Sequence, residues 1–226
     1  AGCATAARAV KPEIEVIGVE AELCPSMSVA LKGESAACDG DTIAEGIAVE
    51  SPGALTRSVV EALVADILLV GEGDIEHAVQ LTAEIEKLVV EGAGAAPLAA
   101  VLTHRGRFSG RTVGLVVSGG NIDSRLLSLV LMRGLVRAGR LVRLRVEVND
   151  VPGSLARVTA RIGELGANIV EVAHERWYYD VPIRMTEVDF LIETRDGDHA
   201  RAVLDGLAEA GISAHRLSST AHEDGR

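Results

Sequence analysis

The residues best suited to chemistry follow an apolar run near the middle of the chain. Residues 111–123 read RTVGLVVSGGNID, and the apolar part ends at SGGN, positions 118–121. The run predicts a buried strand over 113–117, and a helical pattern resumes at Asp123. A strand that delivers a hydroxyl and two glycines to a helix start can hold that hydroxyl against a planar ring, with bare backbone close by. A tight strand-to-helix turn without any ligand would use the same four residues.

Length, charge and hydropathy narrow the class of protein. The 226 residues suffice for one large domain or two ordinary ones. The net charge of −11 argues against a nucleic-acid partner, because phosphate backbones are bound by clustered lysine and arginine. No apolar run approaches the roughly 18 residues that span a bilayer, and we expect no signal peptide. We therefore expect a cytoplasmic protein that does not contact membranes.

The residue types that bind metals or form disulfides give negative expectations. Cys3, Cys24 and Cys38 are odd in number and close to one another in the sequence. This pattern favours reduced thiols without a disulfide framework. The histidines show no metal-ligand spacing, so we expect no zinc site.

Helical and strand patterns alternate through the first part of the chain. Apolar residues make up 48% of the sequence and few of them are aromatic, which suits strands that are buried on both faces. The alternation predicts a mostly parallel sheet with helices on both faces. The expected elements are helices at 4–10, 25–31, 74–89 and from 91 onward, and strands at 13–18 and 67–70.

The pattern changes after Gly139. Apolar and charged residues alternate over 142–148, which predicts a half-exposed strand. The order of elements from there is β-α-β-β-α-β, which predicts a ferredoxin-like plait. An apolar helix over 123–138 would join the two parts. The other elements expected in the plait are helices at 155–165 and 200–207 and strands at 168–172, 188–192 and 213–217.

Several segments in succession resemble one enzyme family. EVIGVE at 15–20, DTIAEGIAV at 41–49, VVEGAGAAPLAAVL at 89–102 and VVSGGNID at 116–123 resemble the second half of the fold-type-II pyridoxal-phosphate enzymes. Within that family they are most similar to the threonine and serine dehydratases. VNDVPGSLARVTARIGELGANIVEV, at 148–172, resembles an ACT domain, a small amino-acid-sensing module.

The resemblance implies an α/β fold: a partial fold-type-II parallel sheet with helices on both faces, followed by a βαββαβ ferredoxin-like ACT domain. It also implies that the chain is the trailing part of a longer protein. The expected divisions are 1–124 for the catalytic part, 125–139 for a connecting helix, 140–218 for the ACT domain and 219–226 for a polar tail.

The resemblance assigns roles to the residues of the SGGN segment. Ser118 would lie beside the pyridine nitrogen of pyridoxal 5'-phosphate, and Gly119 and Gly120 would let the ring approach the backbone. A neutral hydroxyl there leaves the nitrogen largely unprotonated, which suits β-elimination. Asn121 either contacts the cofactor or only starts the following helix.

Three further positions correspond to the surroundings of the cofactor in the family. Glu91 would lie near the ring, or would only place a carboxylate at a helix N-terminus. Gly46 would line the pocket, with Glu45 either beside the cofactor or solvated in a loop. Some relatives bind a divalent cation after the GVE strand. Glu20 is a weak candidate ligand here, because Ser26 occupies the later acidic position, so we expect no metal.

The catalytic lysine of the family has no counterpart in the chain. Lys11, Lys32 and Lys87 are the only lysines, and none lies in the expected motif. The chain therefore holds no predicted catalytic residue, because the Schiff-base lysine and the phosphate-binding glycine loop are missing. The parent reaction would convert L-threonine to 2-oxobutanoate and ammonia, in amino-acid metabolism such as isoleucine biosynthesis. A non-catalytic regulatory remnant and a serine dehydratase or racemase are the alternatives.

The ACT-like part predicts an allosteric effector site. The residues expected to hold an amino acid surround the first strand-to-helix turn, where amide groups suit a carboxylate. Isoleucine or valine is the expected effector, and a homo-oligomer, dimer or tetramer, the expected assembly. ACT domains also serve in dimerisation alone, and that alternative stays open. The candidate effector residues are Asn149, Asp150, Gly153, Ser154 and Asn168.

Overall fold

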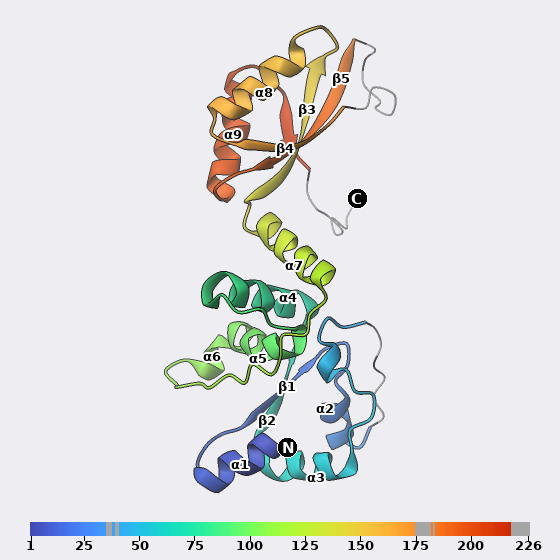
Figure 1. Cartoon of the computed structure of the whole chain (residues 1–226), viewed down its shortest axis with the longest axis vertical. Helices are drawn as coiled ribbons and strands as arrows, with labels where there is room; N and C mark the ends of the chain where they lie inside the picture. Colours follow the sequence, from blue (N-terminus) through green and yellow to red (C-terminus); the bar gives the residue numbers. More distant parts are fainter. Residues whose placement is uncertain (35–37, 39–40, 175–181, 183, 218–226) are drawn as a thin grey trace. The chain divides into compact units, whose positions relative to one another are not determined.

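The computed structural model describes residues 1–34, 38, 41–174, 182 and 184–217 (Figure 1). The chain divides into two units, Ala1–Val130 and Leu131–Arg226, and the division falls within helix α7, Ser124–Arg137. The predicted polar tail at 219–226 and the aromatic residues at 177–179 lie outside the described residues. None of the helices in the described ranges is long and apolar enough to span a membrane.

The first unit is built around two parallel strands. Strand β1 pairs with strand β2 over their whole lengths, with Ile17 opposite Asp66 and Ala21 opposite Val70. The predicted parallel pairing is confirmed, although β1 begins later than the expected strand at 13–18. The elements in chain order are α1 (Gly2–Val10), β1 (Ile17–Ala21), α2 (Ser26–Leu31), the 3-10 helix η1 (Glu45–Ile47), α3 (Ala54–Leu63), β2 (Asp66–Val70), α4 (Glu72–Leu81), the π-helix η2 (Thr82–Glu86), α5 (Gly92–Thr103), α6 (Arg105–Phe108) and α7.

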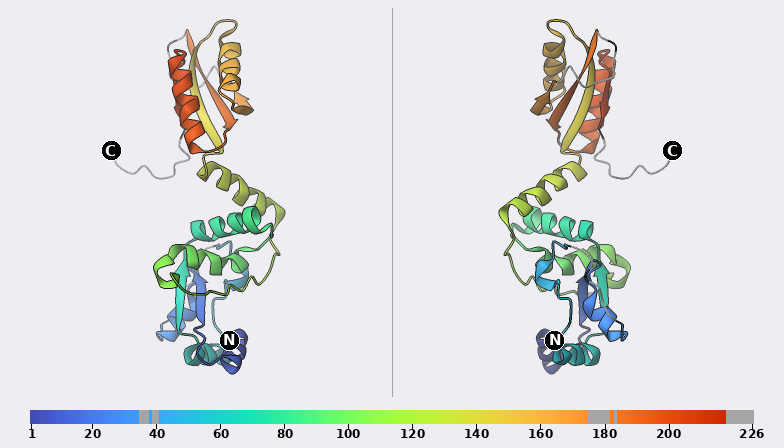
Figure 2. Two further views of the ribbon diagram at one scale, coloured as in Figure 1. Left: turned by 90° about the vertical axis from the view of Figure 1, so that its left-hand side faces the viewer. Right: turned by 90° about the vertical axis from the view of Figure 1, so that its right-hand side faces the viewer.

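Small side chains let the helices of the first unit approach closely. Helices α4 and α5 lie side by side (Figure 2). Ile75 and Val79 of α4 are fully buried in the same core as Ala96 and Ala99 of α5. Alanine offers little bulk, so the two backbones can come close without leaving voids. Leu126 and Leu127, at the start of α7, pack against this core.

The helix expected over 74–89 is shorter than predicted. Helix α4 ends at Leu81, and the chain continues through η2 to Lys87, whose φ of 59° is left-handed. A lysine in this conformation cannot continue a right-handed helix. Ile85 and Val89, in the second half of the helix expected at 74–89, are 66% and 55% exposed.

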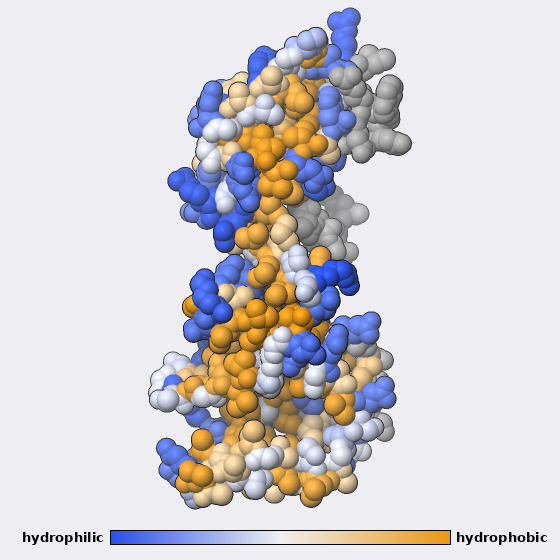
Figure 3. All heavy atoms as spheres, in the orientation of Figure 1, coloured by the Kyte–Doolittle hydropathy of each residue, from blue (hydrophilic) through white to orange (hydrophobic). Residues whose placement is uncertain are grey.

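The buried strand predicted at 113–117 is wrong for this structure. Residues 112–123 form neither helix nor strand, and Val113, Val116 and Val117 are between 39% and 62% exposed. A buried strand needs a hydrogen-bonded neighbour and a layer that covers its side chains. No strand in the described ranges pairs with this segment. Apolar side chains reach the surface on the face of the first unit that Figure 3 draws.

An ion-pair cluster fixes helix α6 to the chain just before β1. Arg107 donates to a carboxylate oxygen of Glu15 at 2.9 Å and also pairs with Asp66, and Arg111 donates to the second oxygen of Glu15. The hydrogen bond from Arg111, and the positive charges of both arginines, hold the pKa of Glu15 below its usual range.

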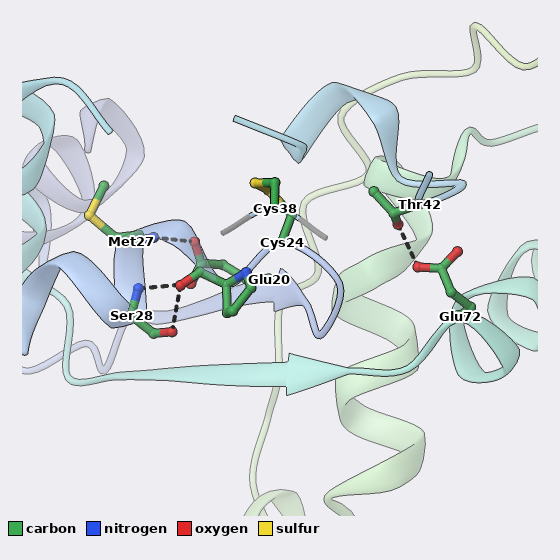
Figure 4. The surroundings of a disulfide bond; sticks show 8 residues. Glu20, Cys24, Met27, Ser28, Cys38, Thr42 and Glu72 are labelled. Atoms are coloured by element: carbon green, nitrogen blue, oxygen red, sulfur yellow. Dashed lines mark hydrogen bonds between the residues drawn. A yellow bond between two sulfur atoms is a disulfide. The ribbon is translucent and has the colours of Figure 1, made fainter. Parts of the chain in front are cut away.

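The prediction of unpaired cysteines is wrong for two of the three. Cys24 and Cys38 form a disulfide with their Cα atoms 4.2 Å apart (Figure 4), whereas Cys3 is free and exposed. The disulfide joins two residues that are 14 positions apart in the sequence. Cysteine count and spacing do not reveal that these two side chains meet.

The second unit is a four-stranded antiparallel sheet with two helices on one face (Figures 1 and 2). The strand order is β4-β5-β3-β6, and β3 pairs with β5 from Leu141 opposite Glu193 to Asn149 opposite Met185. The elements are β3 (Leu141–Asn149), α8 (Ser154–Glu164), β4 (Asn168–Ala173), β5 (Met185–Glu193), α9 (Gly197–Glu209) and β6 (Ala214–Arg216).

The alternation predicted for β3 is confirmed. Leu144 and Val146 are fully buried with Phe190 and Ile192 of β5 in one core. On the opposite face, Arg145 donates two hydrogen bonds to Asp189, at 2.8 and 3.0 Å. Period-two patterning therefore sorts apolar residues to the helix side of the sheet and charges to the other.

A close approach of two glycines joins the start of β3 to the start of α9. Gly139 has a φ of +66°, and a Cβ on it would lie 2.7 Å from the Cα of Gly197. Thr194 donates its hydroxyl to the Gly139 carbonyl and its amide to the Arg140 carbonyl, the latter at 3.0 Å. The Arg140 amide bonds back to Leu135 at 2.8 Å. No residue other than glycine fits position 139 without displacing the backbone of Gly197.

Candidate functional site

Three segments of the first unit meet where only glycine leaves room. A Cβ on Gly92, at the start of α5, would overlap the Ile43 carbonyl group. A Cβ on Gly94 would lie 2.9 Å from the Gly119 carbonyl oxygen, and one on Gly120 would lie 2.7 Å from the Val89 carbonyl oxygen. The loop before η1, the start of α5 and the SGGN segment are therefore packed backbone against backbone.

A cavity of about 580 Å³ opens beside this packing. Four of the predicted cofactor residues line it together: Glu45, Gly46, Glu91 and Asn121. Glu45 and Gly46 belong to η1, Glu91 precedes α5 and Asn121 lies shortly before α7. Separate parts of the sequence therefore supply a single wall of the cavity. The remaining lining residues are Ile43, Gly92, Ala93, Ile122, Asp123 and Leu126.

The SGGN segment reaches the cavity through Asn121, and its glycines pack against Glu91 and Val89. The Glu91 amide donates to the Gly119 carbonyl at 3.1 Å, and a Cβ on Gly119 would lie 2.4 Å from a Glu91 carboxylate oxygen, which would have to move. Ser118 is exposed and is not among the residues that line the cavity. Its predicted position beside the ring nitrogen stays a prediction.

Sequence reasoning missed the residues that hold the loop at 42–44 in place. Glu72, the first residue of α4, accepts a hydrogen bond from the Thr42 hydroxyl at 2.5 Å and another from the Ile43 amide at 2.8 Å. Figure 4 shows Thr42 pointing toward Glu72, and the Ala44 amide donates back to the Thr42 hydroxyl at 3.1 Å. A buried threonine 30 residues from a helix-start glutamate carries no local pattern that could have identified the pair.

The cavity wall is negatively charged. Glu45, Glu91 and Asp123 line it, and no lysine or arginine is found among its lining residues in the described part of the chain. One carboxylate oxygen of Asp123 already has partners, because it accepts hydrogen bonds from the Arg125 and Leu126 amides at 3.0 and 3.1 Å. Asp123 therefore caps α7. A phosphate group would be repelled by this wall, whereas a flat, weakly charged ring would not.

Gly46 also lines a second cavity, of about 540 Å³, between β1, α1 and α3. Its walls are mostly apolar, and Ala1 and Cys3 at the start of α1 contribute to them. The start of a helix presents free amide groups, which suit an anion. The two cavities therefore offer different environments on either side of Gly46.

Glu20 serves as a helix cap. Its two carboxylate oxygens accept from the Met27 and Ser28 amides at 2.7 and 2.9 Å, at the start of α2 (Figure 4). A carboxylate at that position satisfies amides that have no partner within the helix. The described residues contain no group of three or more histidine, cysteine, aspartate or glutamate side chains that could hold a metal ion.

In the second unit, a cavity of about 400 Å³ surrounds the turn between β3 and α8. Four predicted effector residues line it: Asn149, Asp150, Gly153 and Ser154. The fifth, Asn168, does not, because it pairs with Glu193 at the opposite end of β5 from Thr186 and donates its amide to that carboxylate at 3.0 Å.

Two polar residues from outside the turn, which the sequence did not suggest, also line this cavity. Thr186 enters from β5, and His174 follows the last residue of β4. Alternation along β5 could have marked Thr186 as facing inward, since it falls two residues before the buried Val188. His174 had no such signal.

Comparison with known proteins identifies the family. Residues 1–119 match the family described as "Pyridoxal-phosphate dependent enzyme". The match covers more than half of the chain. The chain belongs to this family of pyridoxal-phosphate dependent enzymes.

Two of the similar curated proteins share the name L-threonine ammonia-lyase. The chain is 44% identical to the L-threonine ammonia-lyase of Geobacter sulfurreducens over 93% of its own length and 53% of that protein. It is 38% identical to the L-threonine ammonia-lyase of Thermotoga maritima over 89% of its length and 51% of that protein. The chain thus spans about half the length of the curated relatives it matches.

Solved structures give the same result for the fold. The T.th. threonine deaminase superposes with a TM-score of 0.51 and 38% identity, covering 54% of this chain and 45% of that one. Maize serine racemase gives a TM-score of 0.51 at 31% identity, covering 60% and 43%. Both likenesses involve just over half of this chain.

The residues present fit one side of pyridoxal phosphate. Gly46 and Gly92 leave bare backbone against the first cavity, which would admit a flat ring. The carboxylates of Glu45, Glu91 and Asp123 exclude the phosphate from the same wall. The donor set therefore fits the ring and its substituents and leaves the phosphate to amide groups elsewhere.

Proposed function

We propose that these residues are the C-terminal part of a threonine ammonia-lyase, which converts L-threonine to 2-oxobutanoate and ammonia. Identity of 44% to a protein of that name, over 93% of this chain, is the observation that carries the proposal. The cavity in the first unit supports it, since Glu45, Gly46, Glu91 and Asn121 converge there from separate elements.

Pyridoxal phosphate, when bound, supplies an electron-withdrawing ring that makes the α-proton of an amino acid removable. In this proposal the chain's own residues position that ring. Gly46, Gly119 and Gly120 keep side chains away from its faces, and Asn121 orients its edge. Ser118 offers a neutral hydroxyl to the ring nitrogen, which keeps the nitrogen from carrying a full positive charge. Glu91 braces the SGGN segment through its amide bond to Gly119.

The proton of the substrate must be taken by a group that this chain does not supply. Lys11 and Lys32 follow the ends of α1 and α2, Lys87 follows η2, and none of them lines the cavity. We therefore propose that the chain alone has negligible lyase activity, and that a lysine elsewhere in the parent protein binds the cofactor covalently.

Two alternatives remain in competition with this proposal. Maize serine racemase is 31% identical over 60% of the chain, so a serine racemase or dehydratase shares the same supporting observation at lower identity. A regulatory remnant without catalysis would keep the second unit and lose the chemistry of the first. The threonine assignment is favoured because the similarity to threonine ammonia-lyases covers more of the chain.

A chimera tests the proposal. The N-terminal half of the Geobacter sulfurreducens relative is fused before Ala1, and release of 2-oxobutanoate from L-threonine is measured with pyridoxal phosphate present. We expect lyase activity from the chimera and none from the chain alone, and loss of most activity with Ser118→Ala. A chimera that binds the cofactor but only racemises or deaminates serine would support the alternative enzyme. A folded, cofactor-loaded chimera without any activity would overturn the enzyme proposal.

We further propose that the second unit is an ACT domain that senses an amino acid. Its β-α-β-β-α-β order and the strand order β4-β5-β3-β6 are those of a ferredoxin-like plait, which supports the proposal. The cavity around Asn149, Asp150, Gly153 and Ser154 supports an effector site. Binding of the effector would shift the catalytic part between states of different activity.

We also propose that the protein is cytoplasmic and forms a homo-oligomer, either a dimer or a tetramer. Light scattering would measure the size of this assembly.

A further inference from the structure

Two buried hydroxyl groups line the cavity at the β3–α8 turn. Ser154 is 4% exposed, and its hydroxyl has no hydrogen-bond partner among the described residues. Thr186 is also 4% exposed, and among the described residues its hydroxyl reaches only the carbonyl of the next residue, Glu187, at 3.5 Å. That distance is the outer limit of a hydrogen bond. Buried polar groups in native structures have partners, so two hydroxyls that the described residues leave unsatisfied suit a polar group of a ligand.

The polar groups of this cavity converge from three elements. Ser154 is the first residue of α8, Thr186 lies on β5 and His174 follows β4 with two ring nitrogens that can donate or accept. Gly153, which precedes α8, has a φ of +86°, no side chain and open space where a Cβ would be. No side chain of the described residues caps α8, so amides at its start are open to a carboxylate.

We propose that this cavity selects a small amino acid that carries a hydroxyl group, L-threonine in preference to its isostere L-valine. The inference rests on the proposed sensing function of the second unit and goes beyond it by naming the ligand's side-chain class. Threonine and valine have the same shape, and a hydroxyl in one replaces a methyl in the other. A methyl placed against Ser154 and Thr186 leaves both hydroxyls without a partner, whereas a hydroxyl can donate to one and accept from the other.

This selectivity changes what the sensor reports. The ligand class is that of the substrate of the proposed lyase, not the branched aliphatic amino acid expected from the sequence. The sensor would then respond to substrate supply, in place of feedback by an aliphatic product.

Titration calorimetry on the 226-residue chain tests the inference. L-threonine, L-serine, L-valine and L-isoleucine are titrated separately into the wild type and into Thr186→Val, which removes the hydroxyl and keeps the shape. Thr159→Val is the matched control, because Thr159 lies on α8, is not among the cavity's lining residues and bonds to the Ala156 carbonyl at 3.0 Å. We expect threonine to bind at least about tenfold more tightly than valine in the wild type and in the control. With Thr186→Val the two dissociation constants should become nearly equal.

Each outcome decides a different point. Valine or isoleucine binding as tightly as threonine overturns the inference and leaves the sensing function standing. No binding of any amino acid at millimolar concentration overturns the sensing function and the inference with it. Threonine binding that Thr186→Val leaves unchanged places the ligand outside this cavity and also overturns the inference. Should Thr186→Val not fold, as judged by circular dichroism, Ser154→Ala replaces it with the same expected loss of preference.

Discussion

The two units of the chain differ in how completely their apolar residues find partners within the described sequence. In the second unit each strand of the described residues belongs to one four-stranded sheet, and Leu144, Val146 and Phe190 are fully buried. In the first unit the sheet of the described residues has two strands, and an apolar segment outside it leaves Val116 and Val117 62% and 51% exposed. An apolar run of this kind, without paired backbone or covering side chains, contributes little to stability.

This difference in burial indicates which unit is stabilised by its own core and which holds the candidate site. The second unit closes its own core, so we expect its stability to depend on that core alone. The first unit concentrates its tight packing at the candidate cofactor cavity, around Gly92, Gly94 and Gly119. Substitutions in the two units should therefore have separable effects.

The largest effect is expected from the core of the second unit. Phe190→Ala removes a fully buried ring and should lower the free energy of unfolding of that unit by about 3–5 kcal/mol. Urea unfolding followed by amide hydrogen exchange would assign the loss to β3 and β5, with exchange in α4 and α5 unchanged. Val172→Ala, at a 40% exposed position, is the control and should cost less than about 0.5 kcal/mol. Equal loss of hydrogen-exchange protection in both units would contradict the expectation that their stabilities are separable.

The disulfide should matter almost as much, and only to the first unit. Cys24 and Cys38 are 14 positions apart, and closing a loop of that length stabilises a fold by about 3 kcal/mol. Cys38→Ser should lower the stability of the first unit by that amount, and dithiothreitol should do the same to the wild type. Cys3→Ser is the control, because Cys3 is free and exposed. If the reductant leaves hydrogen exchange around α2 unchanged, the disulfide contributes nothing.

Two glycine substitutions, one in each unit, should change stability in opposite directions and by smaller amounts. Gly92→Ala would drive a methyl into the Ile43 carbonyl group and should destabilise the first unit by about 1–3 kcal/mol. Gly163→Ala, near the end of α8 with open space around it, should stabilise the second unit by about 0.5–1 kcal/mol. Thermal unfolding of both variants checks the two signs. A stable Gly92→Ala protein would show that the backbone packing at the cavity is loose.

The smallest effect is a pH dependence confined to the first unit. The folded-state pKa of Glu15 is lowered, chiefly by the hydrogen bond from Arg111, so its ionised form stabilises the fold. That contribution is fully present above the usual glutamate pKa and is lost as the pH falls through the lowered value. The stability difference between wild type and Glu15→Gln should therefore shrink in acid. Chemical denaturation from neutral pH down to strongly acidic pH measures it, and a difference that grows in acid would contradict the assignment.

Periodicity predicted the second unit well, because its elements follow their own patterns. The alternation from Val142 to Val148 gave the buried face of β3, and the element order gave both helices. The first unit was harder to predict. The run at 113–117 was expected to be buried, but burial depends on neighbouring strands and no local pattern reports whether they are present. Helix α3 had no expectation at all.

The candidate cofactor residues were predictable only through family resemblance, and the structure adds what holds them. Glu45, Gly46, Glu91 and Asn121 line one cavity, but nothing in their spacing implies that meeting. The bond from Thr42 to Glu72 joins residues far apart in sequence, and only folding brings them together. His174 was missed for the same reason.

The junction around Gly139 sets a practical limit on transplanting the second unit into other proteins. A graft that begins at β3 would sever the bond from Arg140 to Leu135 and would leave the new preceding residue to fit against Gly197. A transferable cassette must therefore start upstream of Leu135 and carry Gly139 with it.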